Sequence, residues 1–221
     1  MTTHLVLASA SPARRKLLAA AGLEPSIVVS SVDEDAVTAA ARETYGELVA
    51  EDVALVLARA KAEDVADQID DAVVIGCDSV LDLDGEIHGR PGSPALAISR
   101  WRQMRGRSGV LHTGHWVVDT RSEADGGTGA TLGATASTTV HFAKLSDDEI
   151  EAYVATGEPL RVAGAFTLDG LGGPFVTGIE GDPSNVVGLS LPLLRELLLE
   201  LGLAWHDLRS SAHRGAQGER G

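Results

Sequence analysis

Short apolar runs along the chain alternate with longer stretches in which apolar residues recur every three or four positions. A continuous apolar run or a strict alternation predicts a strand, whereas the longer spacing predicts a helix. The predicted strands are 5–8, 25–30, 72–76, 80–83, 86–88, 110–119, 135–143 and 175–179. The predicted helices are 12–21, 45–67, 93–104, 146–157 and 191–201. Strands and helices that alternate in this way indicate an α/β protein.

Two predicted hairpins decide the kind of sheet. Asp84-Gly85 lies between two strand-like runs and is typical of a type I′ turn. The two long strands on either side of the segment 121–133 are also expected to pair. Antiparallel pairs of this kind make the sheet mixed rather than purely parallel. The segment 121–133 itself, rich in Gly, Thr and Ala, is predicted to be a mobile loop or a hairpin tip.

The link between the first predicted strand and helix could bind an anion. It reads Ser9-Ala10-Ser11-Pro12, followed by Ala13 and the cations Arg14, Arg15 and Lys16. Proline suits the first position of a helix, but positive charges there oppose the helix dipole. A phosphate would resolve the conflict, because the free N–H groups, the two serine hydroxyls and the arginines would converge on it. The alternative is an ordinary strand-to-helix turn with solvated arginines.

Acidic residues follow two other predicted strands. Asp78 comes directly after the run 72–76, where a carboxylate can act as a general base on water or hold a divalent cation. An aspartate in this place can also simply cap a turn. Glu34 with Asp33 could be a second base or metal position, or part of a solvated acidic loop. Ligand sites in open α/β sheets lie beyond the carboxyl ends of strands, which is where these acids are expected.

Two basic residues could complete a phosphate pocket, whereas the histidines, the cysteine and the P-loop motif give no site. Lys61, near the far end of the helix 45–67, and Arg90 are candidates, although each could also be a surface cation. His112 and His115 have the spacing of a zinc pair, but on a strand they would face opposite sides of the sheet. Cys77 is predicted to be a buried core residue. The chain contains no P-loop motif GxxxxGK[ST].

Composition bounds the partners and the compartment. The 221 residues carry a formal net charge of −14, which disfavours polymeric nucleic acid and anionic membranes but allows a small anion in a basic pocket. A single cysteine suits a reducing compartment. Without a signal-type leader or an apolar run of membrane-spanning length, a cytoplasmic protein is expected. Residues 1–209 are expected to form one domain, and the polar, Gly-rich tail 210–221 is predicted to be disordered.

Four long stretches together resemble one known family. They are 7–18 (LASASPARRKLL), 30–34 (SSVDE), 76–91 (GCDSVLDLDGEIHGRP), and 145–170 with 179–194. In this order they resemble the Maf family of nucleoside triphosphate pyrophosphatases. The resemblance implies a mixed, elongated sheet flanked by helices, with two lobes and a cleft, related to inosine triphosphate pyrophosphatases. It also implies hydrolysis of a nucleoside triphosphate to the monophosphate and pyrophosphate with Mg²⁺ or Mn²⁺, and a homodimer.

The family's functional residues carry over position by position. By this resemblance, Asp78 is the proton acceptor, Glu34 and Lys61 assist it, and Asp78 and Glu34 hold the metal ion. Arg90 stands where the family usually has lysine, so the charge is kept while the geometry changes. The phosphate-binding loop contains Ser9, Ser11, Arg14 and Arg15.

Three positions that tune the choice of base in the family depart from its better-known patterns. Ala13 replaces arginine or tryptophan, Ser79 replaces threonine or glutamine, and Asp169 replaces glutamine or glutamate. Because an aspartate only accepts hydrogen bonds, Asp169 would suit a base edge that presents N–H groups, such as guanine or cytosine. The preferred base stays undecided. Two other functions stay open: a non-catalytic nucleotide-binding regulator of cell division, and a hydrolase of sugar phosphates or other metabolites.

Overall fold

A single mixed sheet of seven strands organises the computed structural model, which describes residues 3–209. The strands lie in the order β2-β1-β3-β5-β6-β7, and β4 also pairs with β3. They are β1 (Leu5–Ala8), β2 (Ser26–Ile27), β3 (Val73–Leu83), β4 (Glu86–His88), β5 (Ser108–Asp119), β6 (Thr131–Phe142) and β7 (Val176–Glu180). β1 runs parallel to β2 and β3, whereas the pairs β3–β4, β3–β5, β5–β6 and β6–β7 are antiparallel. The predicted mixed α/β fold is confirmed, and the predicted tail 210–221 lies outside the described residues.

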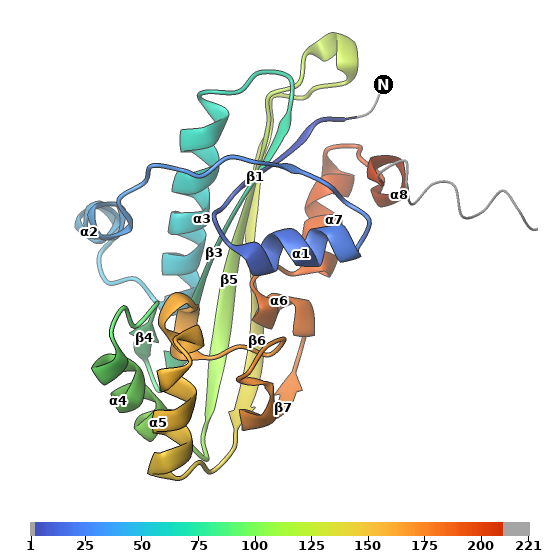
Figure 1. Cartoon of the computed structure of the whole chain (residues 1–221). Helices are drawn as coiled ribbons and strands as arrows, with labels where there is room; N and C mark the ends of the chain where they lie inside the picture. Colours follow the sequence, from blue (N-terminus) through green and yellow to red (C-terminus); the bar gives the residue numbers. More distant parts are fainter. Residues whose placement is uncertain (1–2, 210–221) are drawn as a thin grey trace, which may run out of the picture.

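Helices cover both faces of this sheet (Figure 1). They are α1 (Pro12–Ala20), α2 (Glu34–Tyr45), α3 (Ala50–Ala66), α4 (Pro94–Met104), α5 (Asp147–Ala155), α6 (Pro183–Val187), α7 (Leu191–Glu200) and α8 (Trp205–Leu208). α3 lies along one face of β3 and β5, and α6 and α7 contact β5 and β6 from the other side. α4 and α5 pack together near β4. In the part of the chain described here, no helix is both long and apolar enough to cross a membrane.

The predicted helix 45–67 begins too early, and a separate helix precedes it. α2 ends at Tyr45, where Gly46 takes a φ of 85°, and α3 begins only at Ala50. The Asp33 carboxylate caps α2 by accepting hydrogen bonds from two backbone N–H groups at 3.0 and 3.1 Å. The acidic run that includes Glu34 is therefore a helix start, where carboxylates interact favourably with the helix dipole.

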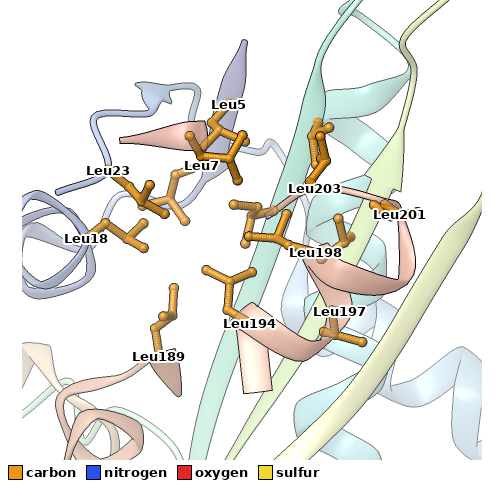
Figure 2. Packing of buried hydrophobic residues seen from close by; sticks show 14 of the residues in the cluster. Leu5, Leu7, Leu18, Leu23, Leu189, Leu194, Leu197, Leu198, Leu201 and Leu203 are labelled. Carbon is orange, nitrogen blue, oxygen red and sulfur yellow. The ribbon is translucent and has the colours of Figure 1, made fainter. Parts of the chain in front are cut away.

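Two apolar clusters stabilise the two ends of the sheet. In the first, leucines from β1, α1 and α7 pack together (Figure 2), and Leu7, Leu18 and Leu198 are fully buried. The second surrounds Trp101 of α4, whose ring meets Phe142 and Tyr153 edge-on at centroid distances of 5.7 and 5.6 Å. Each end of the sheet thus has its own large core, and two smaller clusters that include residues of α3 add to them.

Two glycines allow α3 to lie unusually close to the sheet. A Cβ at Gly76 of β3 would lie 2.3 Å from the carbonyl oxygen of Ala58, and a Cβ at Gly114 of β5 would lie 2.3 Å from that of Ala54. Distances this short are not sterically possible, so any larger residue would push α3 outward. The close approach matters because α3 also carries Lys61.

The prediction that Asp78 follows the end of a strand is wrong. β3 continues from Val73 to Leu83 and pairs with β5 along almost its whole length, so Asp78 lies in mid-strand opposite Gly114. On the other edge of β3, β1 pairs only as far as Gly76 and β4 pairs only from Leu81. Within residues 3–209 this leaves a gap between β1 and β4 along that edge. The polar part of β3 is reached through this gap rather than at a strand end.

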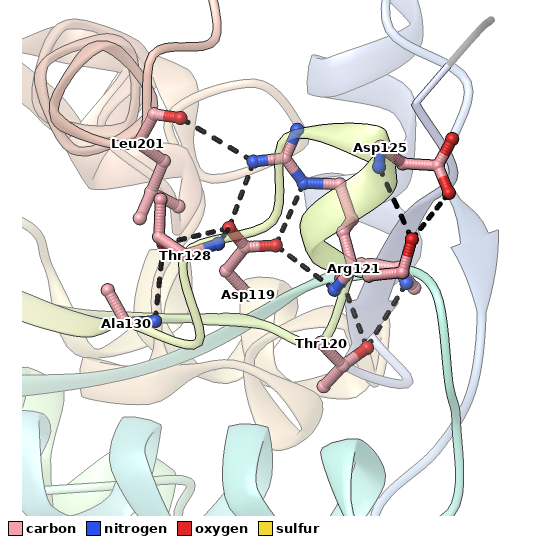
Figure 3. Close-up of polar contacts among 9 residues, drawn as sticks. Asp119, Thr120, Arg121, Asp125, Thr128, Ala130 and Leu201 are labelled. Atoms are coloured by element: carbon pink, nitrogen blue, oxygen red, sulfur yellow. Dashed lines mark hydrogen bonds and ion pairs between the residues drawn. The ribbon is translucent and has the colours of Figure 1, made fainter.

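Residues 121–130 of the predicted segment 121–133 form the tip of the β5–β6 hairpin, one of the two predicted alternatives, and residues 131–133 belong to β6. The buried Asp119 carboxylate forms an ion pair with Arg121 at 2.8 Å and accepts bonds from the amide and hydroxyl of Thr128, both at 2.9 Å (Figure 3). The Arg121 guanidinium also donates to the carbonyl of Leu201 at 3.5 Å, just beyond α7. The tip is therefore anchored to the first core.

Candidate active site

A cleft with a volume of about 1370 Å³ opens at the gap between β1 and β4. The loop after β1 and the start of α1, residues Ala10 to Arg14, form one part of its wall. Asp78, Ser79 and Val80 of β3 lie at its base, and Glu34 begins the helix that lines another side. Most of residues 156–163 and 166–171, which follow α5, also line it, as do Arg90 and Gly188. The cleft thus draws on segments far apart in the sequence.

Lys61 joins the two acids that the sequence predicted for the site. Its ammonium donates to the Glu34 carboxylate at 2.7 Å and forms a short ion pair with Asp78. The side chains of Lys61 and Asp78 are each 8% exposed, whereas that of Glu34 is 44% exposed. Burial favours the neutral form of Glu34, but the hydrogen bond and the positive charge of Lys61 outweigh it and lower the pKa of this carboxyl. The Lys61 ammonium therefore lies between the two carboxyl groups and is bonded to both.

Alternation along β3 places Asp78 and its neighbours on opposite faces. Asp78 shares the α3 face with Gly76, and this is why Lys61 of α3 can reach it. Cys77 is fully buried, and burial raises the pKa of its thiol to about 11. The predicted core role of Cys77 fits this environment, because a thiol with such a pKa is a poor nucleophile at neutral pH.

The side chain of Arg14, from α1, bonds to the edge of β3 within the gap between β1 and β4. The guanidinium, only 6% exposed, donates to the carbonyl of Gly188 at 2.6 Å and to that of Cys77 at 2.8 Å. It also donates to the hydroxyls of Ser9 and Ser79, both at 3.0 Å. Arg14 therefore donates to two backbone carbonyls and two hydroxyls, and it fixes the loop after β1 against β3.

Of the remaining predicted phosphate ligands, some line the cleft and one does not. The Ser11 hydroxyl caps α1 by accepting a bond from the Arg14 amide, and Ser11 lines the cleft. Arg90 is exposed and lines the cleft as well. Arg15 is exposed but lies outside the lining, which instead contains Lys16. The helical spacing could have indicated this, because position 16 lies on the same face as position 13 and position 15 does not.

Residues 4–201 match the family model described as Maf-like protein. This chain belongs to the Maf family. A protein from Salinispora tropica named nucleoside triphosphate pyrophosphatase is 59% identical over 205 residues, covering 90% of this chain and 84% of that protein. Proteins of the same name from Streptomyces coelicolor and Leifsonia xyli subsp. xyli are 56% and 51% identical, and each alignment covers 95% of this chain. The alignments cover 96% of the Streptomyces protein and 98% of the Leifsonia protein.

The three positions that the family resemblance predicts to tune base choice all line the cleft. Ala13 is half-buried in the first turn of α1, and Asp169 is exposed on the irregular segment after α5. Ser79 differs from them, because its hydroxyl is already bonded to Arg14 and lies 2.9 Å from the hydroxyl of Thr113. Ala13 and Asp169 therefore offer more freedom for contact with a ligand than Ser79 does.

Sequence reasoning missed several polar residues of the Maf cleft. Arg42 of α2, Arg161 and Glu158 line it, and none was singled out in the sequence. Arg42 was overlooked because α2 was not predicted. Arg161 and Glu158 lie just after α5 in the short 3₁₀ helix η2 (Glu158–Arg161), a region whose irregular backbone carries no periodic signal.

The acids of the Maf cleft fit a divalent cation that binds together with a polyphosphate. Among residues 3–209, no group of three or more His, Cys, Asp or Glu side chains is placed to hold a metal ion alone. Mg²⁺ is commonly held by one or two carboxylates plus substrate phosphate oxygens, and Asp78 and Glu34 supply such a pair.

His112 and His115 face opposite sides of the sheet, as the sequence predicted. His112 is bonded to Ser137, and His115 accepts a bond from the Ser190 amide.

Proposed function

We propose that this protein is a nucleoside triphosphate pyrophosphatase that releases a nucleoside monophosphate and pyrophosphate. The observation that carries the proposal is the Lys61 ammonium held between Glu34 and Asp78 at a cleft lined by the start of α1. One part of the cleft thus offers carboxylates for proton transfer, and another offers a helix N-terminus and cations for phosphates. The name that the relatives share supports the same reaction.

The triphosphate binds along the N-terminal end of α1. Ser11, Lys16 and Arg90 line the cleft, and the two cations together with the positive end of the helix dipole offset the charge of the phosphates. Ser9 and Arg14 act in substrate binding by holding the loop in shape, since they are bonded to each other and to β3. Arg15 adds positive charge just outside the cleft.

Asp78 is the general base of the reaction. Its carboxylate takes a proton from a water molecule whose oxygen forms the new bond to the α-phosphorus, and the bond from that phosphorus to the bridging oxygen breaks. Pyrophosphate leaves with the electron pair. Lys61 orients Asp78 by bonding to its carboxyl group, and Glu34 keeps Lys61 in place. A divalent cation held by Asp78 and Glu34 would neutralise charge that develops on the phosphate oxygens.

Pyrophosphate release over a panel of ordinary and modified nucleoside triphosphates, with Mg²⁺ or Mn²⁺, tests the proposal. We expect monophosphate and pyrophosphate in equal amounts from at least one member of the panel. Nucleoside diphosphate and inorganic phosphate would instead place the attack at the γ-phosphorus and contradict the assignment. Tight nucleotide binding without any product would favour the non-catalytic regulator, and turnover of sugar phosphates alone would favour the metabolite hydrolase.

The compartment and the assembly state are further parts of the proposal. A cytoplasmic location fits a nucleotide-metabolising protein with a single buried cysteine, and fractionation of cells tests it. A homodimer follows from the family resemblance, and light scattering coupled to size exclusion tests it. A mass near that of one chain, 22.9 kDa, would contradict the dimer.

A further inference from the structure

Glu158 organises a wall of the cleft away from the Lys61 group. One oxygen of its carboxylate accepts hydrogen bonds from the Thr167 hydroxyl at 2.5 Å, the Tyr153 hydroxyl at 3.0 Å and the Gly172 amide at 3.1 Å. The other oxygen accepts a bond from the Leu171 amide at 3.1 Å. One half-buried carboxylate therefore ties the segment 167–172 to α5 and to the start of η2.

The segment is packed directly onto this carboxylate. A Cβ at Gly170 would lie 2.6 Å from a Glu158 oxygen, and a Cβ at Gly172 would lie 2.5 Å from the Tyr153 hydroxyl. Burial favours the neutral form of Glu158, but the bonds from Thr167 and Leu171 outweigh it and lower the pKa of this carboxyl. At neutral pH the segment is thus gathered around a full negative charge.

The charge of this wall indicates which part of a nucleotide would bind there. The segment 167–172 itself carries one charged residue, Asp169, whose exposed carboxylate lines the cleft. The Glu158 carboxylate already accepts four hydrogen bonds, and the cations that line the cleft, among them Lys16, Arg42, Arg90 and Arg161, lie outside this segment. The exposed Asp169 carboxylate repels a triphosphate, and the segment has no cation to attract one. The wall formed by 167–172 is therefore suited to the base or sugar of the substrate rather than to its phosphates.

We infer that Glu158 is a positioning residue for nucleobase selection, acting through the segment 167–172 to hold Asp169 at the cleft wall. The inference rests on the proposed function. Replacement of Glu158 would leave the chemistry at Asp78 intact while it loosens the segment that contacts the base. The loss would then appear in selectivity between bases and in KM rather than in kcat.

The variant Glu158→Gln tests this inference. It places an amide N–H₂ group where backbone N–H groups already point, so two donors face each other. We expect the ratio of kcat/KM between the best and a poor nucleoside triphosphate to fall about tenfold, with kcat for the best substrate within about threefold of wild type. Inorganic triphosphate, which has no base, should inhibit wild type and variant with the same constant.

Two further variants separate positioning from folding. Glu149→Gln is the matched control, because Glu149 also accepts a backbone N–H bond on α5, from Ser146 at 2.8 Å, but lies outside the cleft lining. It should leave selectivity unchanged. Thr167→Val removes one donor to Glu158 and is expected to lower selectivity in the same direction, which keeps the test decisive if Glu158→Gln does not fold. Combined with Asp169→Ala, Glu158→Gln should cause little additional loss of selectivity, because both act through one segment.

The outcomes distinguish this inference from the proposed function. Unchanged base selectivity in a folded Glu158→Gln variant of an active enzyme would overturn the positioning role alone. If inhibition by inorganic triphosphate weakened in Glu158→Gln as much as base selectivity did, the positioning role would be overturned as well. The effect of the variant would then extend to the binding of the phosphates. A wild-type protein that releases no pyrophosphate from any nucleoside triphosphate would overturn the proposed function itself, and this inference with it.

Discussion

The guanidinium of Arg14 donates to the backbone carbonyl of Cys77 at 2.8 Å, in the gap that β1 and β4 leave along the edge of β3. A sheet edge without a partner strand exposes backbone groups that need hydrogen bonds. Here the Arg14 guanidinium donates one hydrogen bond to β3 and a second one to the carbonyl of Gly188. The opening that gives access to the cleft is thus stabilised by a residue from the wall of the cleft.

Replacement of Arg14 should therefore cost stability as well as activity. In Arg14→Lys, an ammonium cannot reproduce the planar set of donors, so at least one buried carbonyl loses its partner. We expect a loss of about 1–3 kcal/mol in the free energy of unfolding, measured by urea titration. The control Arg15→Lys changes an exposed cation and should stay within about 0.5 kcal/mol. Equal stability of the two variants would contradict the assignment.

Gly114→Ala should lower both stability and activity. The new methyl group would meet the backbone of α3, so the helix must move away from the sheet and carry Lys61 with it. We expect a lower melting temperature and a lower kcat. Gly178→Ala is the matched control in β7, because the nearest described atom to its Cβ is His141 Cδ2 at 3.5 Å, an ordinary contact. If Gly114→Ala kept both properties, the close approach of α3 would not matter for the site.

Because of His115, the free energy of unfolding should decrease as the pH falls from about 6.5 to about 4. Burial, aided by the charge of Arg14, lowers the pKa of His115 to about 4, and its neutral ring accepts a bond from the Ser190 amide at 2.8 Å. Because the unfolded chain takes up a proton near pH 6.5, acid favours unfolding throughout this window.

The variant His115→Gln isolates this contribution. It removes the titrating ring, so the free energy of unfolding should depend less on pH between 6.5 and 4 than in wild type. Burial also lowers the pKa values of His88 and His112, but both residues are present in the two proteins and cancel in the comparison. Identical pH profiles would show that His115 does not titrate as the structure implies.

Asp119→Asn should loosen the tip of the β5–β6 hairpin. The change leaves the buried Arg121 charge without its partner, for which we expect a loss of about 3–5 kcal/mol. Faster amide hydrogen exchange at Thr128, whose N–H bonds to Asp119, would accompany the loss. Asp125→Asn changes an exposed carboxylate in the same tip and serves as the control. Equal exchange in the two variants would contradict the anchoring role.

The acid range offers a second check on Asp119. Burial favours its neutral form, but hydrogen bonds from Arg121 and Thr128 outweigh it and lower the pKa of this carboxyl to about 2. Because its unfolded pKa is near 3.9, the stabilisation is complete above that pH and disappears as the pH falls towards 2. Wild type and Asp119→Asn should therefore converge in stability at low pH.

The sequence predicted the elements with strong periodicity but not those defined by long-range contacts. The strand at 5–8 and the helix that begins at Pro12 agree with β1 and α1 because apolar spacing and proline are local signals. α2 carries few buried residues, only Ala41 among its twelve, so its apolar pattern was weak. For the same reason its capping aspartate was considered as a base or metal position or as part of a solvated loop, but not as a helix cap.

The position of Asp78 shows the same limit for the site. The run 72–76 looked complete because polar residues follow it, and nothing local indicates that β5 continues to pair with them. The grouping of Glu34, Lys61 and Asp78 was expected from the family resemblance, whereas their contact depends on two glycines that let α3 approach the sheet. The bonds of Arg14 to Cys77 and Gly188 join residues 63 and 174 positions apart, which no local pattern can reveal.

The steady-state rate of Asp78→Asn tests the central claim most directly. The change keeps the size of the side chain but removes the base, so kcat for pyrophosphate release should fall by a factor on the order of 10² or more. Asp84→Asn is the matched control, because Asn-Gly suits the turn between β3 and β4 and the residue lies outside the cleft. A folded Asp78→Asn protein that retains the full wild-type kcat would contradict the assignment of Asp78 as the general base.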